Sequence, residues 1–376
     1  MEVLGRDGGA SEGRGDQDNP ARDRETVAER IQRTPGQGEK LALAVLNPGG
    51  RDPYQSFATG YGTAATGDGG HPPVNYHAYA AATGGGFHRE VTTIPAQTPV
   101  VLLLLRRDLK LALKTMTALR RSGKRVWISL KEAGTHQVAA LLGDARRLAL
   151  FREAVETADG ALASTPDLVS FYLGAGARQA VFVPTPYPVG VPEWDLSRPL
   201  AGRRGLFIGT REWGVPSRNH LAALLAARQL VDQTGLQQVT VLNADGRHGR
   251  KCLAALDFPH GSLHFIEGRL DYRAYLRLMA QHRLVFQLDR SAVPGQVAGD
   301  ALLCRIPCVG GDGAIERIAF PESCGFGRET GELVEIAARL LTDEAENRRV
   351  VDASQQRALE ILSFPKVAAR LAEVMG

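Results

Sequence analysis

Two arginines, Arg211 and Arg218, stand seven residues apart in a polar loop of the sequence. A short apolar run at 206–208 precedes the loop and a long helical pattern follows it, so the loop joins a buried strand to a helix. A helix N-terminus attracts anions, and a guanidinium matches the oxygens of a phosphate. Either Ser217 or Asn219 could cap this helix. The loop therefore predicts an anion site, at which two arginines could neutralise a diphosphate without a metal; the alternative is that both arginines are solvated surface charges.

An acidic side chain, Asp300, lies in a second segment of the same kind. An apolar strand pattern at 284–288 leads into a polar loop, and a helix predicted over 296–304 carries Asp300 in its first turn. A carboxylate at this place can accept hydrogen bonds from both ribose hydroxyls, as the acid of dinucleotide-binding folds does. Otherwise Asp300 only complements the dipole of its helix.

A third polar stretch, "LKEAGTHQ", follows a strand pattern in the first half of the chain. Lys131, Glu132, His136 and Gln137 could orient a substrate hydroxyl there, and Glu132 or His136 could take its proton. The alternative is a salt-bridged loop whose histidine has only a structural partner.

The elements that must position these residues alternate between strand and helix along the chain. This alternation predicts an α/β protein with two Rossmann-like domains, each built on a parallel sheet, that face each other across a cleft. We expect a disordered tail at 1–39, a first Rossmann-like domain at 40–190 and a proline-rich linker at 191–204. A second Rossmann-like domain at 205–364 follows, and a terminal helix at 365–376 could cross back to the first domain.

Composition and charge limit the classes of molecule that the protein is expected to bind. The chain has 376 residues and a net charge of +4, which fits anionic small molecules and is too weak to indicate nucleic acid. No apolar run approaches the roughly 20 residues of a membrane span. The N-terminus has no apolar core of a signal peptide. We therefore expect a cytoplasmic protein, and we expect its four cysteines to be free thiols rather than zinc ligands.

The stretch at 106–125 predicts a helix with one apolar and one basic face. The basic face, with Lys110, Lys114 and Arg121, could hold the protein at the inner face of a membrane that carries anionic lipids. The alternative is the solvated outer face of a helix that packs on the first sheet.

Five stretches, in this order, resemble motifs of the group 1 (family 4) glycosyltransferases, whose fold is the two-domain GT-B fold. They span roughly residues 125 to 340 and read "RVWISLKE", "ADGALASTPDLVSFYLGAGARQAVFVPTPYPVG", "GTREWGVPSRNH", "SLHFIEGRLDYRAYLRLMAQHRLVFQLDRS" and "GDALLCRIPCVGGDGAIE". The third resembles the family segment whose basic pair binds the donor diphosphate. The fifth places Asp300 at the second acid of the family's E-x7-E motif.

The resemblance implies transfer of a sugar from a nucleotide-diphosphate donor to an acceptor, which could be a glycan, a lipid-linked molecule or a small molecule. It implies a retaining reaction without metal or cofactor other than the nucleotide sugar itself. The domain at 205–364 would then bind the nucleotide sugar and the domain at 40–190 would present the acceptor. Arg211 and Arg218 would stabilise the leaving diphosphate and Asp300 would hold the ribose. The further donor-binding candidates are Gly49, Gly50, Gly209, Thr210, Asn219, Arg269, Ser291 and Gly295.

Four positions depart from the family pattern. Ala292 stands where the first acid of E-x7-E belongs, so the contact to the donor sugar is missing or comes from another acid such as Asp289. Lys131 and Glu132 replace a His-Asp pair, and Arg305 replaces a glycine. Two alternatives therefore stay open besides the transferase: a non-catalytic GT-B subunit that binds a nucleotide or glycan, and a nucleotide-sugar epimerase. A dehydrogenase ranks behind both.

Overall fold

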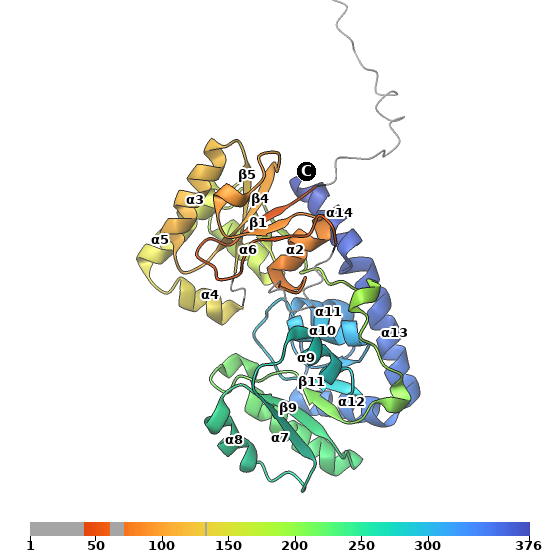
Figure 1. Ribbon diagram of the computed structural model, residues 1–376. Coiled ribbons are helices and arrows are strands. Elements are labelled where there is room, and N and C mark those ends of the chain that lie inside the picture. Colours follow the sequence, from red (N-terminus) through yellow and green to blue (C-terminus); the bar gives the residue numbers. More distant parts are fainter. Residues whose placement is uncertain (1–40, 61–70, 132–133) are drawn as a thin grey trace, which may run out of the picture. The chain divides into compact units, whose positions relative to one another are not determined.

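The computed structural model describes residues 41–60, 71–131 and 134–376 (Figure 1). The tail expected at 1–39 and the candidate base Glu132 lie outside these residues. Leu41–Gly376 forms one compact unit. It contains a sheet of seven strands and a sheet of five, and each sheet is covered by helices. The predicted α/β class with two parallel-sheet layers is confirmed.

The first sheet has the strand order β2-β3-β1-β4-β5-β6-β7. Its strands are β1 (Ala44–Leu46), β2 (Gln55–Ser56), β3 (Gly86–His88), β4 (Val100–Leu105), β5 (Arg125–Leu130), β6 (Gly160–Ala163) and β7 (Ala180–Phe182). All neighbours run parallel except β2, which is antiparallel to β3. The central strand β4 reads VVLLLL and is buried throughout, as expected for a parallel strand with helices on both faces.

Helices cover both faces of the first sheet. One face packs against α3 (Leu109–Arg121), α4 (Thr135–Leu141), α5 (Ala145–Thr157) and α6 (Asp167–Gly174). The other face packs against α2 (Asn75–Thr83) and the last helix, α14 (Phe364–Met375), which lie against each other (Figure 1). A short turn, η1 (Val91–Thr93), follows β3.

Helix α3 is the helix expected within 106–125. Asp108 caps it by accepting a hydrogen bond of 2.9 Å from the Leu111 N–H. Its apolar side is buried on the sheet, and Lys110, Lys114 and Arg121 are exposed on its outer side. No helix in the described parts of the chain is long and apolar enough to cross a membrane.

The second sheet has the strand order β10-β9-β8-β11-β12, and all its strands are parallel. They are β8 (Leu206–Ile208), β9 (Val239–Asn243), β10 (Leu263–Glu267), β11 (Leu284–Phe286) and β12 (Cys308–Val309). The helices are α7 (His220–Thr234), α8 (Gly246–Ala254), α9 (Tyr272–Met279), α10 (Gln296–Cys304), α11 (Ala314–Ala319), α12 (Thr330–Thr342) and α13 (Glu344–Ile361).

The path of the chain through the second sheet reverses at β8. It runs from β8 to β9 and β10 on one side, and then returns to β11 and β12 on the other. Parallel sheets bind their ligands beyond the carboxyl ends of the strands, where the strand order reverses. We therefore expect a ligand to bind at the loops that leave β8 and β11.

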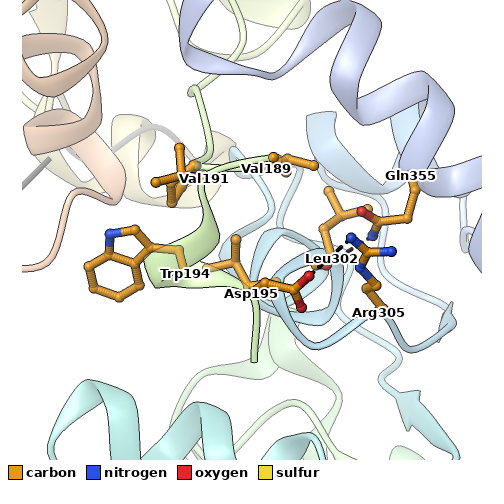
Figure 2. A pocket seen from close by; sticks show the side chains of 10 residues that line it. Val189, Val191, Trp194, Asp195, Leu302, Arg305 and Gln355 are labelled. Atoms are coloured by element: carbon orange, nitrogen blue, oxygen red, sulfur yellow. Dashed lines mark hydrogen bonds and ion pairs between the residues drawn. The ribbon is translucent and has the colours of Figure 1, made fainter. Parts of the chain in front are cut away.

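The proline-rich segment between the sheets packs closely against the second one. Trp194, in the short turn η2 (Pro192–Trp194), is buried, and Asp195 forms an ion pair of 3.0 Å with Arg305 at the end of α10. Figure 2 shows these side chains with Leu302 of α10 and Gln355 of α13. The remaining cavity of about 10 Å³ has room for a single water at most. A second turn, η3 (Leu200–Gly202), completes the segment.

Candidate functional site

Glycine brings the loop after β8 close to α10. A side chain at Gly209 would place its Cβ 2.5 Å from the Cγ1 of Val297, so only glycine allows this approach. The Gly209 N–H donates to the carbonyl of Phe286 on β11, at 2.9 Å. Thr210 is buried beside it, with its hydroxyl 3.0 Å from Nδ1 of His220 at the start of α7. The first residues of the predicted anion loop are thus fixed to both neighbouring elements.

Arg218 lies on the short turn η4 (Pro216–Arg218) and forms an ion pair with Asp289, which follows β11. The Arg218 side chain is 24% exposed and that of Asp289 is 6% exposed, so the pair lies at the edge of the protein with the cation outermost. The other oxygen of Asp289 accepts a hydrogen bond of 2.8 Å from the Ser291 N–H. Asp289 therefore fixes the position of a guanidinium that solvent and a ligand can still reach.

The predicted caps of α7 are wrong. Asn219 occupies the cap position in a left-handed conformation with φ of +47°. Its side chain donates to the carbonyl of Leu288, at 2.9 Å, instead of capping the helix. The Ser217 hydroxyl lies 2.8 Å from that of Ser291. Both side chains thus join the loop after β8 to the loop after β11, a contact that a local helix signal cannot reveal.

Arg211, the other predicted arginine, has a different environment. Its side chain is 57% exposed, and its Nε lies 3.4 Å from a carboxylate oxygen of Glu212. Its charge lowers the pKa of Asp300, although this effect is smaller than that of the hydrogen bonds to Asp300. The two arginines therefore act on two different acids, Arg218 on Asp289 and Arg211 on Asp300.

Asp300 is the fifth residue of α10, which places it in the second turn rather than in the predicted first turn. It is fully buried, and its carboxylate accepts hydrogen bonds from the hydroxyls of Tyr272 and Tyr187, the latter at 3.4 Å. Tyr275 supplies a third hydroxyl. Burial raises the pKa of Asp300 to about 7, and the three hydroxyls limit the rise. A ribose would have to displace a tyrosine to reach Asp300, and its ribose role stays a prediction.

Glu316, on α11, is a buried acid that sequence reasoning missed. Its Oε1 accepts a hydrogen bond of 2.9 Å from the amide of Gln287, and its Oε2 has no hydrogen-bond partner among the described residues. Burial raises the pKa of Glu316 to about 8. Side chains at Gly295 or Gly313 would lie within 2.1 and 2.4 Å of Oε2. The glycine-rich stretch "GGDGAIE" held this signal, because only glycines let backbone surround a carboxyl so closely.

Ala292, which stands where the family motif has its first acid, has a tightly held backbone. Ala292 has a left-handed φ of +48°, and its N–H donates to a carboxylate oxygen of Asp312 at 2.8 Å. Burial raises the pKa of Asp312. The Asp312 N–H in turn donates to the carbonyl of Asp289, at 3.1 Å. Two acids, Asp289 and Asp312, therefore lie beside the position where the family motif has its own.

Residues after β5 of the first sheet contact this region. His136, on α4, places Nδ1 3.4 Å from the Ser217 hydroxyl. A side chain at Gly134 would lie 3.1 Å from the carbonyl oxygen of Ser291. Asn75, at the start of α2, donates to the side chain of Gln296 at 3.3 Å. The structure thus links the predicted acceptor-side residue His136, through Ser217, to the predicted donor-side residue Ser291. Separately, the Lys131 ammonium lies 5.9 Å from the ring centre of Tyr76.

A cavity of about 330 Å³ lies at the carboxyl end of β1, where the order of the first sheet also reverses. Gly49 lines it with a φ of +71°, and Arg106 donates to the Gly49 carbonyl at 3.4 Å. Gly50 packs against Asn47 so closely that any side chain would collide. The full lining is Leu46, Pro48, Gly49, Arg89, Glu90, Val91, Leu111 and Thr115. Its volume is in the range of small-molecule sites.

The remaining predicted donor-binding residues, Arg269 and Gly295, lie in different parts of the second sheet's loops. Arg269 is exposed after β10, which is separated from β8 by β9, so the structure does not place it beside the Asp289 edge. Gly295 is in contact with the Glu316 carboxyl at the start of α10. Within the described residues there is no group of three or more His, Cys, Asp and Glu side chains that could hold a metal ion.

Comparison with solved structures identifies the fold. HepE from Anabaena in complex with UDP aligns with a TM-score of 0.59 and 14% identity, over 89% of this chain and 99% of that one. Sucrose-phosphate synthase from Thermosynechococcus elongatus gives 0.56 and 16%, over 89% and 98%. A trehalose-phosphate synthase from Burkholderia xenovorans in complex with glucose-6-phosphate gives 0.55 and 13%, over 75% of each chain.

These neighbours share the two-domain GT-B fold, and at such identities the likeness establishes the fold alone. The chain therefore has the GT-B fold that the motifs predicted. No family model matches the sequence. No curated protein matches it either.

Proposed function

We propose that this protein is a glycosyltransferase that moves a sugar from a nucleotide-diphosphate donor to an acceptor hydroxyl. The observation that carries the proposal is the Arg218–Asp289 pair at the point where the strand order of the second sheet reverses. A cation held in place by a nearly buried acid, yet open on its outer side, suits a phosphate group. The neighbours HepE and trehalose-phosphate synthase support this proposal, since solved complexes of these proteins contain UDP and UDP-2-fluoro glucose.

The role of the arginines follows from the charge that develops in the reaction. As the bond between the sugar and the diphosphate breaks, negative charge accumulates on the leaving phosphate. Arg218 and the exposed Arg211 would stabilise that charge without moving, and such preorganised charge is usually the largest catalytic contribution. We propose that the reaction needs no metal or cofactor and retains the anomeric configuration, as the motif resemblance implies.

The acceptor is proposed to bind on the first-sheet side. The cavity beside Gly49 has the size for a sugar or a similar small molecule, with Arg89 and Glu90 to bind hydroxyls and Leu46 and Leu111 to pack against an apolar face. We propose that His136, which is exposed on α4, accepts the proton of the attacking hydroxyl. Lipid-linked and free acceptors are both compatible with this arrangement, and the basic face of α3 would support a lipid-linked one.

The test is turnover of a panel of nucleotide sugars with a panel of sugar acceptors, by wild type and by the Arg211→Ala and Arg218→Ala variants. Removing one preorganised donor costs about 10²–10³-fold in kcat, and we expect a loss of that size for Arg218→Ala. Arg348→Ala, on the exposed side of α13, is the matched control and should retain wild-type turnover. Undiminished turnover in both loop variants would refute the phosphate role.

Ala292, at the position of the motif's first acid, favours a second candidate function, a non-catalytic subunit that binds a nucleotide or glycan. Tight nucleotide binding without transfer or donor hydrolysis would support it. The epimerase alternative predicts that a nucleotide sugar incubated alone is converted to its epimer, which NMR of the sugar protons detects.

A further inference from the structure

A chain of contacts links His136 of the first sheet's helices to Arg218 of the second. His136 Nδ1 lies 3.4 Å from the Ser217 hydroxyl, which lies 2.8 Å from the Ser291 hydroxyl. The Ser291 N–H donates to Asp289 at 2.8 Å, and Asp289 pairs with Arg218. No single sequence motif contains this connection, because its members come from three separate segments: helix α4, the turn η4 and the loop after β11.

Ser217 is the member with the best-defined environment. Its backbone carbonyl accepts a hydrogen bond of 2.7 Å from the Arg290 N–H, which fixes the turn that carries it. Its hydroxyl rests against Ser291, which is 1% exposed. The imidazole of His136, in contrast, lies on an exposed residue of α4. A rigid hydroxyl therefore meets a solvent-exposed ring whose orientation it can set.

We propose that Ser217 is the positioning residue for His136. In this arrangement the Nδ1–H of His136 donates to the Ser217 oxygen, and the Ser217 hydroxyl donates to the Ser291 oxygen. The hydrogen bond made by one ring nitrogen fixes the tautomer of the other, so Nε2 is left with a free electron pair. The opposite direction of the chain would put a proton on Nε2 and leave it unable to act as a base.

This inference rests on the proposed glycosyltransfer and specifies its proton step. The O–H bond of the acceptor breaks and its proton bonds to Nε2 of His136, which becomes an imidazolium. The acceptor oxygen forms its bond to the anomeric carbon on the face from which the diphosphate departs, as the proposed retention requires, and the bond from that carbon to the diphosphate breaks. Its electron pair leaves on the diphosphate, close to Arg218. Ser217, Ser291 and Asp289 thus join His136, which takes the proton, to Arg218, which lies beside the leaving diphosphate.

The tautomer can be measured without any assay of activity. Long-range proton–nitrogen NMR correlation spectra of the full-length protein labelled with ¹⁵N in histidine distinguish an Nδ1–H ring from an Nε2–H ring. The nine histidines of the chain make a His136→Asn spectrum necessary for assignment. We expect an Nδ1–H ring in wild type and a shift toward the Nε2–H form in Ser217→Ala. An Nε2–H ring in wild type would overturn the proposal.

Kinetics supply the second readout. A general base typically contributes roughly 10²–10⁴-fold, and misorienting one should cost part of this. We expect Ser217→Ala to lower kcat about tenfold with little change in the KM of the donor, and Ser217→Thr, which keeps the hydroxyl, to restore most of it. Ser170→Ala, at an exposed site on α6, is the matched control. Equal kcat in wild type and Ser217→Ala would overturn the positioning role, whereas absent turnover in wild type would instead overturn the proposed function.

Discussion

Asp289 and Asp300 stand eleven positions apart in one segment of the chain, and each has an arginine acting on it, yet their environments are opposite. Asp289 follows a strand and pairs with Arg218 at the protein edge. Asp300 lies inside α10, completely buried beneath tyrosine hydroxyls, with a pKa raised to about 7. The acid at the end of a strand orients a cation at the protein edge, whereas the one inside a helix is an interior hydrogen-bond acceptor.

Part of that interior role is to hold the segment between the two sheets. Tyr187, whose hydroxyl donates to Asp300 and to the Gln296 carbonyl, comes from this segment and pairs with Ser363 in a short bridge. Its ring lies flat on Gly299, where a Cβ would come within 2.1 Å of a ring carbon. Gly299 and Asp300 therefore form the binding surface for the ring and the hydroxyl of Tyr187. We infer that Asp300 contributes to stability and Asp289 to function.

The largest effect we predict on stability tests the Asp289 side of this contrast. Arg218→Ala leaves the nearly buried Asp289 without its cation, and losing one partner of such a pair costs about 3 kcal/mol in the free energy of unfolding. The double variant Arg218→Ala, Asp289→Asn should regain most of this stability without regaining turnover. Urea unfolding and donor turnover of the same samples provide the measurements. If the double variant regained turnover, the arginine would act only through structure.

A second predicted effect, on how the free energy of unfolding depends on pH, tests the role of Asp300. The carboxyl ionises near its ordinary pKa of 3.8 in the unfolded chain and near 7 in the folded protein, so between these values only the folded state holds the proton. The free energy of unfolding should therefore fall as the pH rises from 5 to 8, and Asp300 should account for about 3 kcal/mol of that fall. In Asp300→Asn the fall should shrink by this amount.

The control for this titration is Asp352→Asn, on an exposed site of α13, which should show the same dependence on pH as wild type. Glu316 acts in the same direction as Asp300, because burial raises its pKa to about 8. Asp300→Asn should thus reduce the decline in stability without abolishing it. A wild-type decline unchanged in Asp300→Asn would mean that Asp300 stays charged in the folded protein.

The sequence predicted the two sheets and the loop after β8, because alternating apolar runs and helical periodicity are local signals. The resemblance of five stretches to family motifs, not the periodicity, implied the GT-B fold. The sequence could not predict which way Asp300 faces, since its partners Tyr187 and Tyr272 come from distant segments that meet only in the fold. The contact between His136 and Ser217 is equally non-local. Glu316 was missed because a motif position alone does not reveal burial.

Binding of a nucleoside diphosphate is the most direct test of the central claim, that the edge at Arg218 holds the diphosphate. Calorimetric titration of wild type with UDP, GDP and ADP, followed by titration of the variants with the tightest of these, separates the two acids. We predict that Arg218→Ala weakens binding at least tenfold, while Asp300→Asn changes the Kd less than twofold. Equal binding by wild type and Arg218→Ala, together with loss of binding in Asp300→Asn, would contradict the account and place the nucleotide at the interior acid instead.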